Sequence, residues 1–179
     1  MSDTTRAESA LKNKENKTMA TPAQLEALPC YYRETIPPEY IDPMGHMNVR
    51  WYMALYDQAT WYFFEAIGMN QDYFKNQQAG AFALKHFLSY FSEIHEGQTV
   101  AIRSRVLGRT DKRFHFMHFM INESTARLAS CFEALGTHAD LRQRRSAPFP
   151  PSIADAIDNR LNRDSQLDWQ APVCGILNL

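Results

Sequence analysis

The stretch NVRWYMALYDQATWYFFEAIG, residues 48–68, decides the fold of this chain. It contains no proline, and its first glycine is Gly68, so it predicts one long helix that ends there. Its polar side chains fall on one narrow stripe of that helix, and they are Arg50, Asp57, Gln58 and Glu65. Aromatic and aliphatic side chains occupy the other positions, which is typical of a buried helix. We therefore expect the rest of the fold to enclose this helix.

Strand-like runs lie on both sides of the helix. One candidate, YYRETIP, precedes it, and four more follow a short element at residues 72–78: AFALKHFLSYFSEI, TVAIRSRVLG, RFHFMHFMIN and LASCFEALGTHADL. In the second of these four, apolar residues alternate with Arg103 and Arg105, as in a half-buried strand. Consecutive strands predict an antiparallel meander, and a buried helix predicts a sheet wrapped around it. The expected fold class is α+β.

Composition excludes several classes of protein. The chain has 179 residues, of which 45% are hydrophobic and 12% aromatic, which suits one globular domain rather than a disordered chain. A formal net charge of -1 argues against a nucleic-acid binder, whose domain would be basic. No apolar run approaches the ~20 residues of a membrane span. No glycine-rich phosphate loop follows an expected strand, which disfavours the common nucleotide-binding folds.

Cysteine usage and the chain start indicate the compartment. Cys30, Cys131 and Cys174 lie far apart, which supports neither a disulfide framework nor a zinc site. The first residues lack the apolar core of a secretory signal. We therefore expect a cytoplasmic protein that needs no metal and no cofactor.

Three regions are expected along the chain. Residues 1–24 contain few large apolar side chains up to residue 20 and are expected to form a mobile tail. Residues 25–146 are expected to form the wrapped domain. The stretch SAPFPP, residues 146–151, marks a boundary, and residues 147–179 are expected to supply a helix and an apolar tail that docks on the domain.

The segment between the first strand and the long helix carries the candidate chemistry. Asp42 and Pro43 predict a turn, and Gly45 permits a positive φ there. Because the helix begins near Asn48, Asp42 and His46 are expected beside the free amide N–H groups of a helix N-terminus, which favours negative charge. Such amides can stabilise a developing oxyanion while a carboxylate attacks or activates water, and acyl transfer needs this pairing.

The pattern Asp-x-x-Gly-His-x-Asn, followed by an aromatic helix, resembles the hotdog-fold acyl-CoA thioesterases of the 4-hydroxybenzoyl-CoA thioesterase type. The resemblance covers roughly residues 30–145 and includes the order of strand, helix and strands. It implies a hotdog fold, in which an antiparallel sheet wraps around one long central helix. It also implies hydrolysis of an acyl-CoA to a free carboxylate and CoA, by a homodimer or homotetramer with active sites at subunit interfaces.

The resemblance also implies roles for individual residues. Asp42 would be the nucleophile or general base, with His46 and Asp57 as further catalytic candidates. The backbone amides of Val49 and Arg50 would form the oxyanion hole. The acyl pocket is expected to consist of Asn48, Trp51, Tyr52 and Tyr56. The residues expected to bind CoA are Arg109, Lys112 and Arg113.

Plainer roles stay open for these residues. Asp42 can simply organise an Asx turn, and Asn48 can simply cap the helix. His46 can orient the loop, Asp57 can belong to the solvated stripe, and the aromatic residues can be core. The basic residues can be solvated surface.

Other functions and the acyl group also stay open. A non-catalytic acyl-CoA binder and a hotdog dehydratase or hydratase are the alternatives, although Thr60 stands where dehydratases of this fold carry a helix Glu, fourteen residues after the His. The APFPP stretch and residues 171–175 are similar to a thioesterase subgroup associated with carnitine breakdown, whose acyl group is betainyl. A trimethylammonium head can bind aromatic faces by cation–π attraction, and the helix candidates for this are Trp51, Tyr56, Trp61 and Tyr62.

Overall fold

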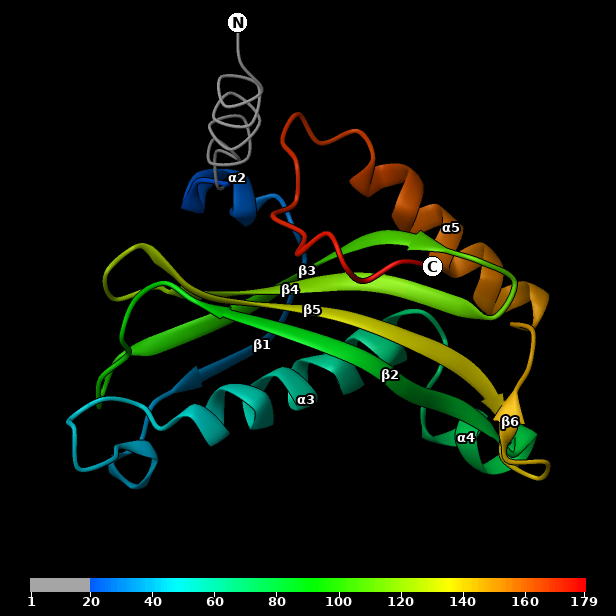
Figure 1. The fold of residues 1–179 in the computed structure, drawn as a ribbon, viewed down its shortest axis with the longest axis horizontal. Coiled ribbons are helices and arrows are strands. Elements are labelled where there is room, and N and C mark those ends of the chain that lie inside the picture. The colour runs from blue at the N-terminus through cyan, green and yellow to red at the C-terminus, as the bar shows by residue number, and fades with distance from the viewer. Residues whose placement is uncertain (1–19) are drawn as a thin grey trace, which may run out of the picture.

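A computed structural model describes residues 20–179 and shows one curved antiparallel sheet with the long helix α3 (Val49–Ala66) lying across its concave face (Figure 1). The strands are β1 (Cys30–Thr35), β2 (Ala79–Tyr90), β3 (Thr99–Arg109), β4 (Arg113–Asn122), β5 (Arg127–Asp140) and β6 (Arg145–Ser146). The other helical elements are α2 (Pro22–Glu26), the 3-10 turn η1 (Pro38–Tyr40), α4 (Gln71–Gln77) and α5 (Pro151–Asp164). This is the α+β hotdog architecture that the sequence predicts. No helix within the described range is both long enough and apolar enough to cross a membrane.

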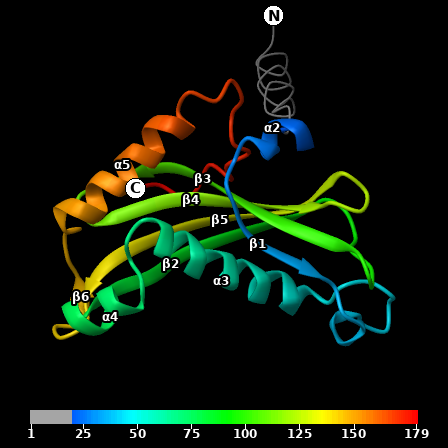
Figure 2. The ribbon, with the colours of Figure 1, turned by 180° about the vertical axis from the view of Figure 1, so that it is seen from behind.

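The strand order is β1-β3-β4-β5-β2, and the two-residue β6 pairs with β5. Strands β3, β4 and β5 form the expected meander, but the expectation that the first of the four strands adjoins the second was wrong. β2 pairs with β5 instead. Because α3 carries the chain across the concave face, the strand before it and the strand after it occupy opposite edges of the sheet (Figure 2).

Helix α3 begins and ends where local chemistry predicts. Asn48 has an extended backbone, and its side-chain oxygen accepts the Arg50 N–H, which makes it the N-cap. Gly68 has a φ of +90° just after the helix end, a conformation that favours glycine. The face toward the sheet is buried and consists of Tyr52, Leu55, Tyr56, Ala59, Phe63 and Phe64.

The opposite face of α3 is exposed in the single chain. Val49 is 59% exposed, Trp61 52% and Tyr62 49%. The expectation of a helix buried on nearly all sides is therefore correct for one face only. The sheet curls around the helix but does not close over it.

Buried polar contacts fasten α3 to the sheet. His118 of β4 is fully buried, and its ring contacts the Ser104 hydroxyl at 2.6 Å and the Thr60 hydroxyl at 3.0 Å. Burial lowers the pKa of His118 to about 3, so the ring is neutral. The Thr60 hydroxyl donates to the Tyr56 carbonyl, so His118 Nε2 donates to Thr60 and Nδ1 accepts from Ser104.

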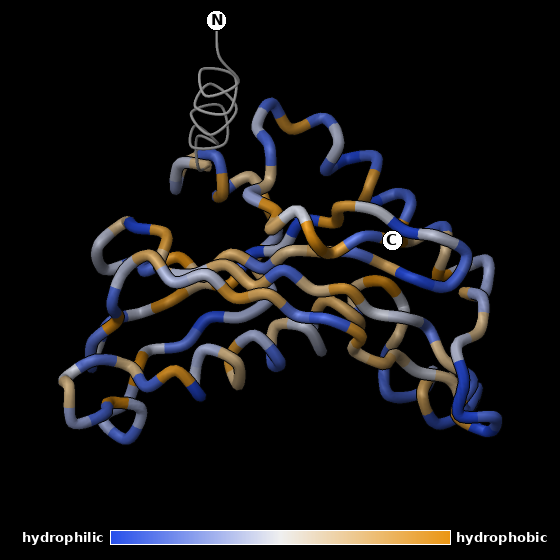
Figure 3. Tube along the Cα trace, in the orientation of Figure 1, coloured by the Kyte–Doolittle hydropathy of each residue, from blue (hydrophilic) through white to orange (hydrophobic). Residues whose placement is uncertain are grey.

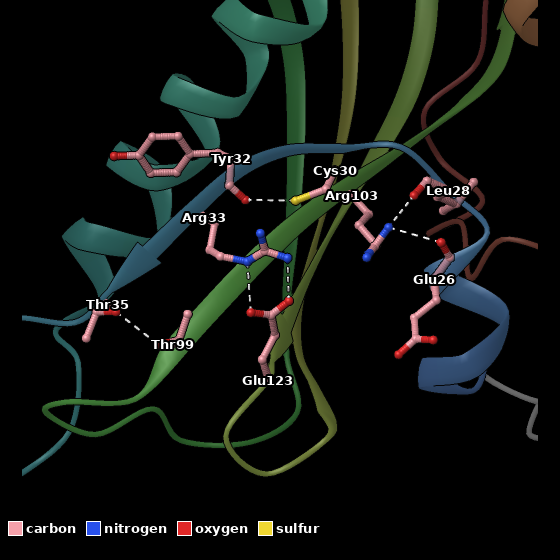
Figure 4. Close-up of polar contacts among 9 residues, drawn as sticks. All are labelled: Glu26, Leu28, Cys30, Tyr32, Arg33, Thr35, Thr99, Arg103 and Glu123. Carbon is pink, nitrogen blue, oxygen red and sulfur yellow. Dashed lines mark hydrogen bonds and ion pairs between the residues drawn. The ribbon is translucent and has the colours of Figure 1, made fainter.

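The β3 edge is completed by two different partners. β1 pairs only with the first half of β3. Farther along, the Val106 N–H donates to the carboxylate of Asp164 in α5, which is 5% exposed. Figure 4 shows how Arg33 of β1 reaches Glu123 with two hydrogen bonds and how Arg103 of β3 reaches backbone carbonyls near α2.

The convex face of the sheet is covered by segments from both described ends of the chain. Leu25 of α2 and Trp169 of the C-terminal tail belong to an apolar cluster on this face, together with Phe119 of β4. Figure 3 shows mostly apolar residues in the middle of the sheet and polar residues in the β5–β6 turn. Residues 22–24, which the expected tail included, belong to α2, and residues 1–19 lie outside the described residues.

Candidate active site

The loop between η1 and α3 is a tight, internally bonded turn. The Asp42 N–H donates to the His46 carbonyl at 3.0 Å, and the Gly45 N–H donates to the Asp42 carbonyl at 2.9 Å. Gly45 has a φ of +87°, as the sequence predicts. The turn therefore holds Asp42 next to the first turn of α3.

The two oxygens of the Asp42 carboxylate have different partners. Oδ1 accepts the Met44 N–H at 2.8 Å, which is the Asx turn of the plainer interpretation. Oδ2 lies 3.5 Å from Asn48 Nδ2 and 3.8 Å from His46 Nδ1. The Asp42 side chain is only 8% exposed, against 27% for His46. One oxygen thus builds the turn while the other faces the start of the helix.

The amide groups at the helix start are not equivalent. The Arg50 N–H already donates to Asn48 Oδ1 at 3.2 Å, whereas its expected role in an oxyanion hole stays a prediction. The Val49 N–H has no acceptor among the described residues. Capping by Asn48 thus leaves Val49 as the available donor at the positive end of the helix dipole.

A cavity of about 430 Å³ opens over this helix start. Asp42, His46, Asn48, Val49 and Tyr52 line it. These are five of the site residues expected from the sequence, and the structure brings them together.

Sequence reasoning missed the second wall of the cavity. This wall is the end of β2 and the residues after it, namely Tyr90, Phe91, Ser92 and Glu93. The Tyr90 ring lies 5.0 Å from that of Tyr52, at an interplanar angle of 89°. These residues come 38 or more positions after Tyr52, so only the crossing of α3 over β2 brings them to the site.

The segment after β2 also holds the loop between η1 and α3. His95 Nδ1 lies 2.9 Å from the Gly45 carbonyl, and the Met47 N–H donates to the Ile94 carbonyl at 2.7 Å. The loop geometry therefore depends on a long-range contact as well as on its own turn. His95 carries no local sequence signal for this role.

Two residues of the expected acyl pocket lie elsewhere. Trp51 stacks on Tyr40 with ring centroids 3.8 Å apart, and Tyr56 is fully buried against Phe132. Successive helix residues turn by about 100°, which carries Trp51 away from the cavity. Tyr56 shares a side with Tyr52 but lies one turn farther along, under the sheet. Of the four residues of the expected acyl pocket, Asn48 and Tyr52 line this cavity.

Asp57 is separated from the other catalytic candidates. It lies eight residues beyond Val49, about 12 Å along the helix axis. It lines a second cavity of about 160 Å³ with His86 and several aromatic residues, and it accepts the Trp61 indole N–H at 3.3 Å. Burial lowers the pKa of His86, and the Asp57 charge opposes that shift. The structure does not bring Asp57 to Asp42.

The expected CoA-binding residues lie at the end of the sheet that is farther from the cavity. β3 starts near the cavity and runs eleven residues, about 35 Å, to Arg109 (Figure 1). Arg109 is held by both carboxylate oxygens of Asp158 in α5. Lys112 and Arg113 follow in the turn to β4. Within one chain, these three residues do not reach the cavity.

Comparison with known proteins identifies the family. Residues 36–157 match the thioesterase-like superfamily. The betainyl-CoA thioesterase of Pseudomonas aeruginosa is 26% identical over 127 residues, which is 71% of this chain and 80% of that protein. The L-carnitine dehydrogenase/betainyl-CoA thioesterase of Agrobacterium fabrum is 28% identical over 122 residues, which is 67% of this chain but only 24% of that protein.

Solved structures agree on the fold. A Staphylococcus aureus protein in complex with CoA superposes with a TM-score of 0.76 at 21% identity, over 85% of this chain and 96% of that one. The family match spans the loop, α3 and strands β2 to β6, and so includes every residue that lines the cavity. The chain belongs to the thioesterase-like superfamily and is a thioester hydrolase with the hotdog fold.

Proposed function

We propose that this protein hydrolyses an acyl-CoA in the cavity at the start of α3, with Asp42 as the reacting carboxylate and the Val49 N–H as the oxyanion donor. The observation that carries this proposal is that Asp42 and Val49 line one cavity while the Val49 amide has no acceptor among the described residues. A charged acceptor and an unpaired donor facing one space are the two groups that acyl transfer requires.

Two routes use the same groups. In the first, Asp42 Oδ2 attacks the thioester carbon, the C–S bond breaks to release CoA thiolate, and water hydrolyses the resulting anhydride. In the second, Asp42 takes a proton from a water molecule that attacks the same carbon, and CoA leaves as before. In both routes negative charge collects on the carbonyl oxygen, where the Val49 N–H and the helix dipole stabilise it.

Asn48 and His46 act as positioning residues in this mechanism. The Asn48 amide group faces Asp42 Oδ2 at 3.5 Å, and the same side chain caps the helix that supplies the oxyanion donor. His46 Nδ1 lies 3.8 Å from the same oxygen. Both contacts orient the reacting oxygen toward the cavity.

The protein works as a homodimer or homotetramer in this proposal. β2 is an edge strand whose middle is exposed, with Leu84 at 45% and Phe87 at 40%. Pairing with β2 of a second copy would remove this unpaired edge. The twofold axis of such a pair would bring the far end of the partner sheet, with its Lys112 and Arg113, toward this cavity and the CoA phosphates.

The proposed acyl group is short and cationic. The matched relatives from Pseudomonas aeruginosa and Agrobacterium fabrum are named for betainyl-CoA, whose acyl group carries a trimethylammonium head. Dehydration is disfavoured because Thr60, fourteen residues after His46, lines the second cavity and not the first. Hydrolysis at Asp42 needs no group from that second cavity.

A thiol-release assay over short aliphatic, aromatic and cationic acyl-CoAs tests the proposal. Free CoA should appear with at least one of the three classes, and Asp42→Asn should abolish most of that release. If no acyl-CoA in the panel releases thiol but CoA thioesters still bind, the result would instead support a non-catalytic acyl-CoA binder.

A further inference from the structure

We propose that Tyr52, Tyr90 and Phe91, with Glu93 beside them, form the subsite that recognises a cationic acyl head group. This inference rests on the proposed hydrolysis at Asp42 and adds the residues that select the acyl group. It moves cation recognition from the helix aromatics expected from the sequence to the segment at the end of β2.

The charge of the cavity favours a cation. Apart from its tyrosines, its titratable lining residues are Asp42, His46 and Glu93, and neither Lys nor Arg stands among the described residues that line it. An anionic acyl group would face two carboxylates there, whereas a quaternary ammonium would be attracted by both. The charged side chains of the cavity therefore favour a cation, away from the Val49 amide that would hold the carbonyl oxygen.

The aromatic geometry suits a quaternary ammonium. The Tyr52 and Tyr90 rings lie at 89° to each other, and because Tyr52 is only 5% exposed, Tyr90 supplies most of the aromatic surface of this pair. Phe91 follows directly and also lines the cavity. Tyr90 is 48% exposed and Phe91 42%, so their faces are available to a ligand in the cavity. Aromatic walls around one methylated cation are the usual way in which proteins bind such groups.

The ionisation of Tyr52 supports this arrangement. Burial, with smaller contributions from the charges of Tyr90 and Glu93, raises the pKa of Tyr52 to about 12. The ring is therefore a neutral phenol at working pH.

The length of a short acyl group separates this subsite from the Asp57 cavity. In a betainyl group, one methylene joins the quaternary nitrogen to the carbonyl carbon. With the carbonyl oxygen on the Val49 amide, the head group must remain beside the helix start. Asp57 is about 12 Å farther along the axis, in a cavity of only about 160 Å³.

The same placement would assist the reaction. A fixed positive charge one methylene from the carbonyl lies next to the oxyanion as it forms, and unlike charges at this distance attract. Substrate recognition and transition-state stabilisation would thus come from one charge. A neutral acyl group of the same shape would gain neither.

The test compares two thioesters that differ in charge and not in shape: betainyl-CoA and 3,3-dimethylbutyryl-CoA, in which a quaternary carbon replaces the nitrogen. We expect kcat/KM of the wild type to favour betainyl-CoA by about 10-fold or more. Glu93→Gln and Tyr90→Leu should each lower this preference by about 3- to 10-fold, mainly through KM for betainyl-CoA. Because both residues line the cavity, each change is also expected to lower the rate with the neutral thioester, and the loss with betainyl-CoA should exceed that loss by about 3- to 10-fold.

Matched controls separate recognition from loop damage. Glu96→Gln makes the same chemical change at an exposed residue that does not line the cavity, and it should leave the preference unaltered. Because Glu93 lies 3.7 Å from His95, which holds Gly45, the neutral thioester also reports whether the loop is intact.

Three outcomes would overturn the inference or its basis. Equal kcat/KM for the two thioesters in the wild type, or an unchanged preference in both variants, rejects the cation subsite while thioester hydrolysis stands. If neither thioester nor any other acyl-CoA is hydrolysed, the proposed function fails. The subsite is then judged by equilibrium binding of the same two thioesters, and equal affinities reject it.

Discussion

At the scale of single residues, the two carboxylate oxygens of Asp42 have different partners, because Oδ1 accepts the Met44 N–H and Oδ2 contacts Asn48 Nδ2; the proposed mechanism assigns the reaction to the second. Asp42→Asn keeps the acceptor for the Met44 N–H and removes the charge. We expect kcat to fall by about 10²- to 10⁴-fold, with little change in KM or in the melting temperature. Steady-state kinetics and thermal melts on one preparation measure both.

The contrasting variant is Asp42→Ala, which also removes the turn acceptor. It should lose the same activity and about 1 kcal/mol of stability besides. A well-folded Asp42→Asn protein with near-normal kcat would contradict the role of this carboxylate and return catalysis to His46 or Asp57.

The Asn48 side chain both caps α3 and contacts the Asp42 carboxylate, and substitutions can separate these two effects. Ser is as good an N-cap as Asn but is too short to reach Asp42 Oδ2. Asn48→Ser should therefore keep the stability of the wild type and lower kcat by about 10-fold, since the reacting oxygen loses its donor. Asn48→Ala should lose about 1 kcal/mol as well. Equal melting temperatures for Ser and Ala would argue against the cap, and wild-type kcat in Asn48→Ser would argue against positioning.

At the scale of elements, the contact between α3 and β4 through His118 makes stability depend on pH. The folded pKa of this ring is about 3, far below the ordinary value near 6.5. Protonation therefore favours the unfolded chain, so stability is fully present above pH 6.5 and is lost as the pH falls toward 3. Between pH 7 and pH 5 we expect His118 alone to remove about 2 kcal/mol.

His118→Gln provides the comparison. Denaturant unfolding at both pH values should show that this variant loses about 2 kcal/mol less than the wild type over the same interval, although it is less stable at pH 7. Parallel losses in the two proteins would show that His118 is not the titrating group.

The accuracy of the sequence predictions follows the range of the interactions that decide each element. The turn at Asp42, the cap at Asn48 and the end at Gly68 depend on neighbours within a few residues, and the sequence predicts all three. Tyr90 and Glu93 join the site only through the position of β2 against α3, so no local pattern marks them. Trp51 and Tyr56 lie outside the cavity for the same reason: the helix pattern identifies apolar residues but not the side that the sheet covers.

At the scale of the whole molecule, the exposed edge of β2 predicts self-association. Light scattering at working concentration should give at least twice the mass of one chain. Leu84→Asp combined with Phe87→Asp should yield a folded monomer that has lost most of its activity, since the partner would no longer supply Lys112 and Arg113. A stable, fully active wild-type monomer would contradict this assembly.

The tail after α5 has a practical consequence for handling the enzyme. It packs on the convex side of the sheet, and Leu177 is buried there while the final residue, Leu179, is 42% exposed (Figure 1). The cavity lies at the start of α3, on the concave side. A molecule attached to a resin or a sensor chip through an extension of its C-terminus would have the convex side of its sheet toward the solid support. The cavity would then face the solution and stay accessible to a ligand as large as CoA.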